Sequence, residues 1–120
     1  MTKAVFLILN DLDLYDEIME LYYDLHVGAT TIDSQGMGKT LMQHDEDFPI
    51  FSSLRKLMAE NKPYNRTIMS VVHDDETCSE LVDKLEEIIN MRPGVGFMFV
   101  MPVVSCHGYK ANAKEESSAS

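Results

Sequence analysis

The sequence contains no tryptophan, only two cysteines, and half as many basic as acidic residues. Lys and Arg number 10 against 20 Asp and Glu, which gives a formal net charge of −10 at pH 7. Because Lys and Arg supply most of the affinity for a phosphate backbone, we do not expect the chain to bind nucleic acid. Two cysteines without a signal peptide are more typical of a reduced, cytoplasmic protein than of a disulfide-stapled secreted domain.

Long hydrophobic runs are also missing. The longest apolar stretches, residues 4–9 and 97–104, fall well short of the ~20 residues that span a bilayer, so no membrane insertion is expected. A chain of 120 residues with 45% hydrophobic residues can form one domain with a real core. We assign that domain to residues 1–110 and expect a disordered tail over 111–120, where the residues are small, polar or charged.

Four segments have the β-branched and aliphatic composition of strands, and we predict strands over 4–9, 29–34, 67–72 and 96–101, the last broken at Pro102. The run over 4–9 is continuously apolar, which is typical of a central strand. The strand over 96–101 is expected at an edge of the sheet, where its apolar side chains need to be covered.

Two segments have helical spacing. The first helix is predicted to follow an N-cap at Asp11 or Asp13 and to end near Gly28, and the second to begin with the capping box Thr77-x-x-Glu80 and to end by Asn90. The order strand, helix, strand, strand, helix, strand predicts a ferredoxin-like βαββαβ fold of the α+β class. In that fold a four-stranded antiparallel sheet carries both helices on one face.

The connection between the second and third strands, about residues 37–65, is far longer than a hairpin needs. Within it, Pro49 and Pro63 bracket a pattern that predicts a short amphipathic helix over 49–61. The apolar face of this helix needs covering, and self-association covers it most simply.

Two turns combine glycine with a basic residue. The first is residues 36–39. Gly38-Lys39-Thr40 resembles the end of a phosphate-binding P-loop, but Asp33 stands where that motif requires glycine. It is either an anion-binding turn or a plain glycine turn. The second, residues 91–96, contains Arg92 and is either a similar binding turn or a helix C-cap followed by a Pro-Gly turn.

The residues that bind metals or perform nucleophilic catalysis are scattered. Only Cys106 and His107 are neighbours among the histidines and cysteines, so we expect no dedicated metal site. No nucleophile, base and orienting acid can be grouped from the sequence, so we expect no catalytic residues and no enzymatic activity.

Two segments carry a family resemblance. Residues 28–38, Gly-Ala-Thr-Thr-Ile-Asp-Ser-Gln-Gly-Met-Gly, resemble the second strand and loop base of PII-like signalling proteins, the nitrogen regulatory protein P-II superfamily, and residues 93–97, Pro-Gly-Val-Gly-Phe, resemble the approach to their last strand. In element order the resemblance extends from Lys3 to about Val104. It implies a homotrimer that holds a small effector, typically an adenine nucleotide, in clefts between subunits. The long loop, called the T-loop in that family, then presents the ligand state to a target protein.

By position, the resemblance assigns ligand binding to Gln35, Gly36, Met37, Gly38 and Lys39 at the loop base and to Arg92, Gly94 and Gly96 in the facing turn. Typical nitrogen-regulatory members have a basic Gly-Asp-Gly-Lys turn before the last strand, whereas residues 95–98 here contain no cation. Tyr64, the only tyrosine of the loop, lies close to its end, so uridylylation is not expected. The alternative function is a non-nucleotide interaction module or a metal- or small-metabolite-responsive subunit. The related CutA-like divalent-cation tolerance proteins are a distant option, because they usually have a short hairpin where this chain has its long connection.

Overall fold

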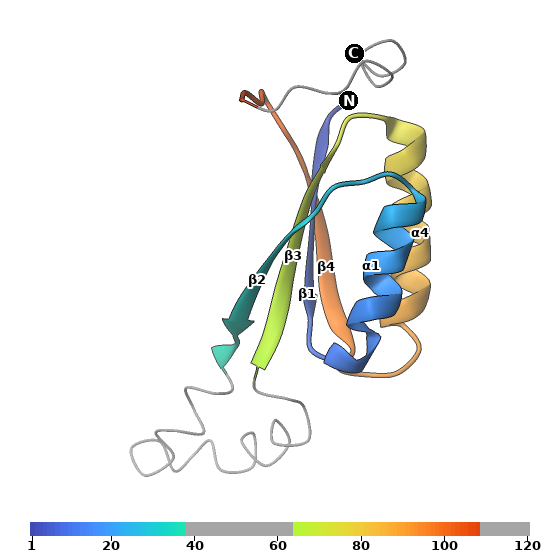
Figure 1. The fold of residues 1–120 in the computed structure, drawn as a ribbon, viewed down its shortest axis with the longest axis vertical. Coiled ribbons are helices and arrows are strands. Elements are labelled where there is room, and N and C mark those ends of the chain that lie inside the picture. Colours follow the sequence, from blue (N-terminus) through green and yellow to red (C-terminus); the bar gives the residue numbers. More distant parts are fainter. Residues whose placement is uncertain (38–63, 109–120) are drawn as a thin grey trace.

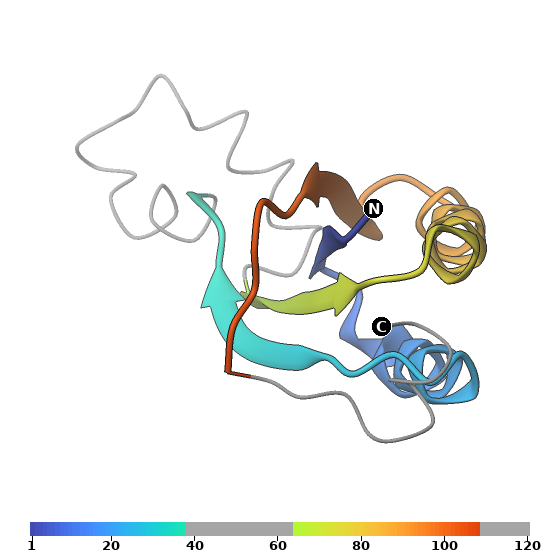
Figure 2. The same ribbon diagram turned by 90° about the horizontal axis from the view of Figure 1, so that it is seen from above.

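In the computed structural model, which describes residues 1–37 and 64–108, four strands form one antiparallel sheet in the order β2-β3-β1-β4. The strands are β1 (Lys3–Leu9), β2 (Thr30–Gln35), β3 (Tyr64–Val72) and β4 (Gly96–Pro102). The helices α1 (Tyr15–Asp24) and α4 (Asp75–Ile89) both lie on one side of this sheet (Figures 1 and 2). The predicted ferredoxin-like fold is therefore confirmed. The predictions for residues 38–63, including the helix over 49–61, and for the tail over 111–120 concern residues that the structure does not describe.

The core lies between the sheet and the two helices. Because strand side chains alternate between faces, Val5, Leu7 and Leu9 of β1 all point toward the helices, and each is fully buried. The helices contribute the inward positions Ile18 and Tyr22 of α1 and Cys78, Leu81 and Leu85 of α4. β1 pairs with β3 on one side and β4 on the other, which confirms it as a central strand. β4 lies at an edge, as predicted.

Strand boundaries differ from the sequence predictions by one to three residues. β3 begins at Tyr64, because Tyr64 and Asn65 pair with the end of β2. Pro102 does not break β4: it is the last residue of that strand, paired with Lys3. A proline, which has no amide N–H, is tolerated in an edge strand.

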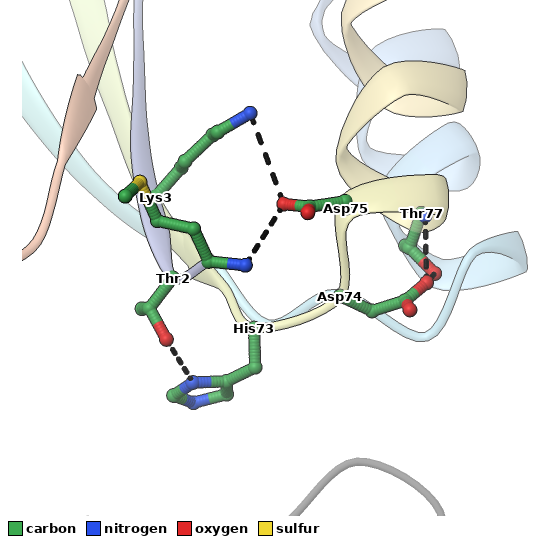
Figure 3. Close-up of polar contacts among 7 residues, drawn as sticks. Thr2, Lys3, His73, Asp74, Asp75 and Thr77 are labelled. Carbon is green, nitrogen blue, oxygen red and sulfur yellow. Dashed lines mark hydrogen bonds and ion pairs between the residues drawn. The ribbon is translucent and has the colours of Figure 1, made fainter.

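The start of α4 also differs from the prediction. Thr77 is not the N-cap; Asp74 is, and its carboxylate accepts hydrogen bonds from the Thr77 backbone N–H at 2.8 Å and from the Thr77 hydroxyl at 2.7 Å (Figure 3). These bonds hold the pKa of Asp74 below its ordinary value. Aspartate and threonine are both good caps, and the extended backbone of residue 74 decides between them. Before the first helix, Asp11 caps a 3-10 turn, Leu12–Leu14, by accepting a hydrogen bond from the Asp13 backbone N–H, and α1 then begins after Leu14, which provides no side-chain cap.

Further polar contacts gather at the same end of the sheet, where β1 begins and β3 ends. The Met1 α-amino group and Lys3 Nζ lie 3.1 Å and 3.8 Å from Asp75 Oδ1, and Thr2 Oγ1 lies 3.1 Å from His73 Nδ1 (Figure 3). They connect β1 to the segment between β3 and α4. These contacts lie at the surface, among exposed or half-buried side chains, so their contribution to stability is small.

Candidate functional site

The two predicted halves of the ligand site lie at the same end of the sheet but at opposite edges. Leu9 of β1 pairs with Gly96 at the start of β4 and, on its other side, with Arg66 of β3, which pairs with Asp33 of β2. β2 and β4 are therefore three strand spacings of about 4.8 Å apart, roughly 14 Å in all. Gly38 and Lys39 lie outside the described residues. Within one chain, Gln35, Gly36 and Met37 are not brought together with Arg92, Gly94 and Gly96.

The turn before β4 is held against the end of β1. The Val95 carbonyl accepts hydrogen bonds from the backbone N–H groups of Asn10, at 2.9 Å, and Asp11, at 3.1 Å. Gly94 has a φ of +83°, a conformation that favours glycine. At Gly96 a Cβ atom would lie 2.9 Å from the Ile8 carbonyl oxygen, so this close approach also requires glycine. Both glycines thus have a structural role in the turn.

Arg92, the cation of this turn, forms an ion pair with Asp11. The Asp11 side chain is only 16% exposed, whereas that of Arg92 is 53% exposed. The guanidinium group has five N–H donors, so a ligand at the turn would meet a partly neutralised cation with donors still directed to solvent. The sequence alone does not show that Asp11 is the partner of Arg92.

The base of the long connection carries a network of polar side chains on the sheet face away from the helices. Ser34 Oγ donates to Asn65 Oδ1 and lies 2.9 Å from Thr67 Oγ1. Asn65 Nδ2 donates to Asn10 Oδ1 at 3.3 Å. Asn65 is 8% exposed, and a Cβ at Gly36 would lie 3.6 Å from its Nδ2 atom. This network links the end of β2 and the start of β3 to Asn10, the residue that follows β1.

Arg66, a cation that the sequence alone does not single out, lies at the same end of the sheet, on the face that carries the helices. The Arg66 guanidinium lies over the Tyr15 ring, 4.3 Å from its centroid, and its Nε is 3.4 Å from Asp33 Oδ1. The Tyr15 hydroxyl lies 3.0 Å from Thr31 Oγ1. The position of Arg66 in the sequence, just after the long connection, could have indicated a role at this end of the sheet. Only the pairing of the strands shows that it lies beside Asp33 and Tyr15.

The sheet face away from the helices, which we call the open face, is mainly apolar beyond the polar network. Phe6 and Phe99 stack there with ring centroids 4.9 Å apart, and Phe97, 62% exposed, lies 6.0 Å from Phe99. The register places further apolar side chains on this face: Ala4, Ile8, Ile32, Met69, Val71 and Met101. No described helix covers it (Figure 2). Exposed apolar surface of this kind marks interaction sites.

Within residues 1–37 and 64–108, no three His, Cys, Asp or Glu side chains lie close enough to hold a metal ion. Cys78 is buried and Cys106 is exposed, and the two are not joined by a disulfide. None of the helices formed by the described residues is both long and apolar enough to cross a membrane.

Comparison with known proteins identifies the fold and no activity. No protein-family model and no curated protein matches the sequence. Among solved structures, a functionally unknown protein from Pediococcus pentosaceus ATCC 25745 is similar, with a TM-score of 0.57 and 19% identity over 90% of this chain and 97% of that one. A DUF3240 family protein from Shewanella baltica OS155 is also similar, with a TM-score of 0.51 and 12% identity over 91% and 97% of the two chains. At these identities the similarity establishes the fold alone.

Proposed function

We propose that this chain is a cytoplasmic PII-like signalling protein that assembles as a trimer and binds a small effector, such as an adenine nucleotide, between subunits. Its 37–65 connection relays the ligand state to a target protein. The observation that carries the proposal is the division of the candidate site. Gln35 and Gly36, which precede Lys39 in the sequence, and the 91–96 turn with Arg92 lie at one end of the sheet but at opposite edges.

A ring of subunits would unite the two halves. β2 and β4 run in opposite directions, and β2 ends at the same end of the sheet where β4 begins. If β2 of one subunit lies along β4 of the next, the Gln35 end of one strand meets the Gly96 end of the other. Both strands have one side without a pairing partner in the described sheet, so their backbone groups are available for such pairing.

The distribution of polar surface supports an assembly with the sheets inside. The open face is apolar, whereas the helices carry the acidic residues Asp16, Glu17, Glu20, Asp24, Asp75, Glu76, Glu80, Asp83, Glu86 and Glu87. Lys84, paired with Glu80 at 3.4 Å, is the sole Lys or Arg of α1 and α4. Like charges would oppose contact between the helix faces. Self-association therefore favours the open face.

One observation favours the alternative function, an interaction module or a subunit responsive to a metabolite or metal without nucleotide. Arg92 is already paired with Asp11, and residues 95–98 offer no other cation. A triphosphate at this turn would have to compete with the Asp11 carboxylate or rely on Lys39. Ligand screening must therefore include compounds without phosphate.

The test combines light scattering with a thermal-shift panel of ATP, ADP, AMP, cyclic dinucleotides, bicarbonate and divalent metals. We expect a mass three times the 13.6 kDa of one chain and stabilisation by one nucleotide. Ligand at a hundredfold its Kd adds about 2.7 kcal/mol, a shift of several degrees. Lys39→Ala combined with Arg92→Ala should abolish the shift, whereas Lys84→Ala, which removes a helix-side cation, should retain it.

Each outcome has a distinct meaning. A monomer would contradict the intersubunit site, and a trimer indifferent to every nucleotide would contradict the nucleotide and leave the alternative function. A double variant that binds ATP as the wild type does would exclude the proposed residues. Deletion of residues 41–62 should leave a folded trimer that no longer binds its target; loss of the trimer would instead make the connection structural.

A further inference from the structure

The two halves of the candidate site are connected inside one subunit by hydrogen bonds that cross the sheet from edge to edge. The connection begins at Ser34 on β2, passes through Asn65 on β3 to Asn10 at the end of β1, and ends at Val95 before β4. Two of these residues lie on β2 and β3, and the other two lie directly after β1 and directly before β4. Side-chain contacts of this kind are not required by the strand pairing itself.

The donor and acceptor chemistry orders these bonds in one direction. A serine hydroxyl has one proton, and Asn65 Oδ1 has only acceptor capacity, so Ser34 donates to Asn65 and the Thr67 hydroxyl donates to Ser34. The Asn65 amide nitrogen then donates to Asn10 Oδ1, and the Asn10 backbone N–H donates to the Val95 carbonyl. The conjugated amide of Asn65 allows its two hydrogen bonds to polarise one another, whereas at Asn10 the side chain and the backbone N–H are coupled only through the position of that residue.

Because Asn65, at the centre of the connection, is buried, it is sensitive to the loss of a hydrogen-bond partner. Asn65 is 8% exposed, so its amide cannot exchange a lost protein partner for water without a local rearrangement. Residues 10 and 11 are equally constrained at the other end, because both backbone N–H groups bond the same Val95 carbonyl and Asp11 also holds Arg92. A change at the loop base therefore reaches the turn through groups that have few alternative partners.

We propose that Asn65 and Asn10 are positioning residues that couple the base of the 37–65 connection to the 91–96 turn of the same subunit. The role of this coupling in ligand sensing rests on the proposed function, but the coupling itself is a property of the chain without ligand. Rearrangement of the loop base on one edge of the sheet would then loosen the turn on the other edge, about 14 Å away.

Amide hydrogen exchange followed by NMR on the full, ligand-free chain tests this coupling. In Ser34→Ala, we expect the Asn10 and Asp11 amides to exchange roughly threefold to tenfold faster, the effect of losing about one hydrogen bond. The Leu7 amide, in the middle of β1, should be unchanged. Thr31→Ala is the matched control, because it removes a hydroxyl of the same strand on the opposite face of the sheet.

A second variant tests whether the effect of Ser34→Ala reaches Asn10 and Asp11 through Asn65. In Asn65→Ala the two amides should already exchange faster, and adding Ser34→Ala should change them no further. The proposal is overturned if Ser34→Ala leaves them unchanged, if Thr31→Ala accelerates them equally, if Leu7 accelerates to the same extent, or if the effect of Ser34→Ala persists without Asn65. Because no ligand is present and the readout is local, these results are independent of the thermal-shift and scattering test of the proposed function.

Discussion

Tyr22 of α1 provides a sharp test of the packing between the helices and the sheet. Its side chain is 2% exposed, and within the described part of the chain neither its hydroxyl nor that of buried Ser70 has a hydrogen-bond partner. Burial raises the pKa of Tyr22 from 10.0 to about 12, and the nearby Ser70 hydroxyl lowers it by less. The neutral phenol is therefore the form that the folded protein favours.

The magnitude follows from the two pKa values. Because the folded pKa lies above the unfolded one, the neutral phenol contributes its full stability below pH 10, and this contribution is lost as the pH rises through 12. At about 1.4 kcal/mol per pKa unit, the loss is about 1.4 kcal/mol at pH 11 and approaches about 2.7 kcal/mol well above pH 12. Tyr22→Phe has no proton to lose, so it should be free of this loss.

The assay is urea unfolding followed by far-UV circular dichroism at pH 9 and pH 11, at one protein concentration. The free energy of unfolding of the wild type relative to Tyr22→Phe should fall by about 1.4 kcal/mol between these pH values. At pH 7 the variant should be at least as stable as the wild type, because the lost hydroxyl has no partner. Tyr23→Phe, one residue away and 80% exposed in the wild type, is the control. Equal pH dependence in all three proteins would refute the reasoning.

Three further predictions concern the turn, a helix cap and the open face. Gly96→Ala should destabilise the fold by about 1–3 kcal/mol in urea unfolding, because its Cβ would meet a backbone carbonyl; Gly28→Ala, with nothing within 4 Å, should not. Asp74→Ala should lower the Tm at pH 7, and the difference from the wild type should shrink as the pH falls below 3.8, because the hydrogen bonds from Thr77 hold the folded pKa of Asp74 below that ordinary value and protonation removes the charge that they stabilise. Phe97→Asp should convert the proposed trimer to monomers in light scattering, whereas Tyr23→Asp on α1 should not; a retained trimer would show that the open face is not the interface.

Much of the candidate site was accessible from local sequence. Gly94 adopts the positive φ that a Pro-Gly turn suggests, and the glycines at 36 and 96 lie at strand ends, as predicted. The sequence did not indicate which polar side chains contact one another. Asp11 was interpreted only as a helix cap, yet it also binds Arg92. Asn10 and Asn65 had no assigned role, although they form the centre of the hydrogen-bonded connection.

The sequence by itself determined the order of helices and strands, the central position of β1 and the exposed apolar edge at β4, because these follow from hydrophobic periodicity and short-range chemistry. Only the tertiary structure decided which polar groups meet. Residues 10 and 65 are far apart in the sequence and become neighbours through the antiparallel register of β1 and β3. The structure also separated Gly36 at the end of β2 from Gly94 and Gly96 before β4, because the strand order places two strands between these edges. Periodicity indicates which face a side chain occupies, but only the pairing of distant strands sets its neighbours.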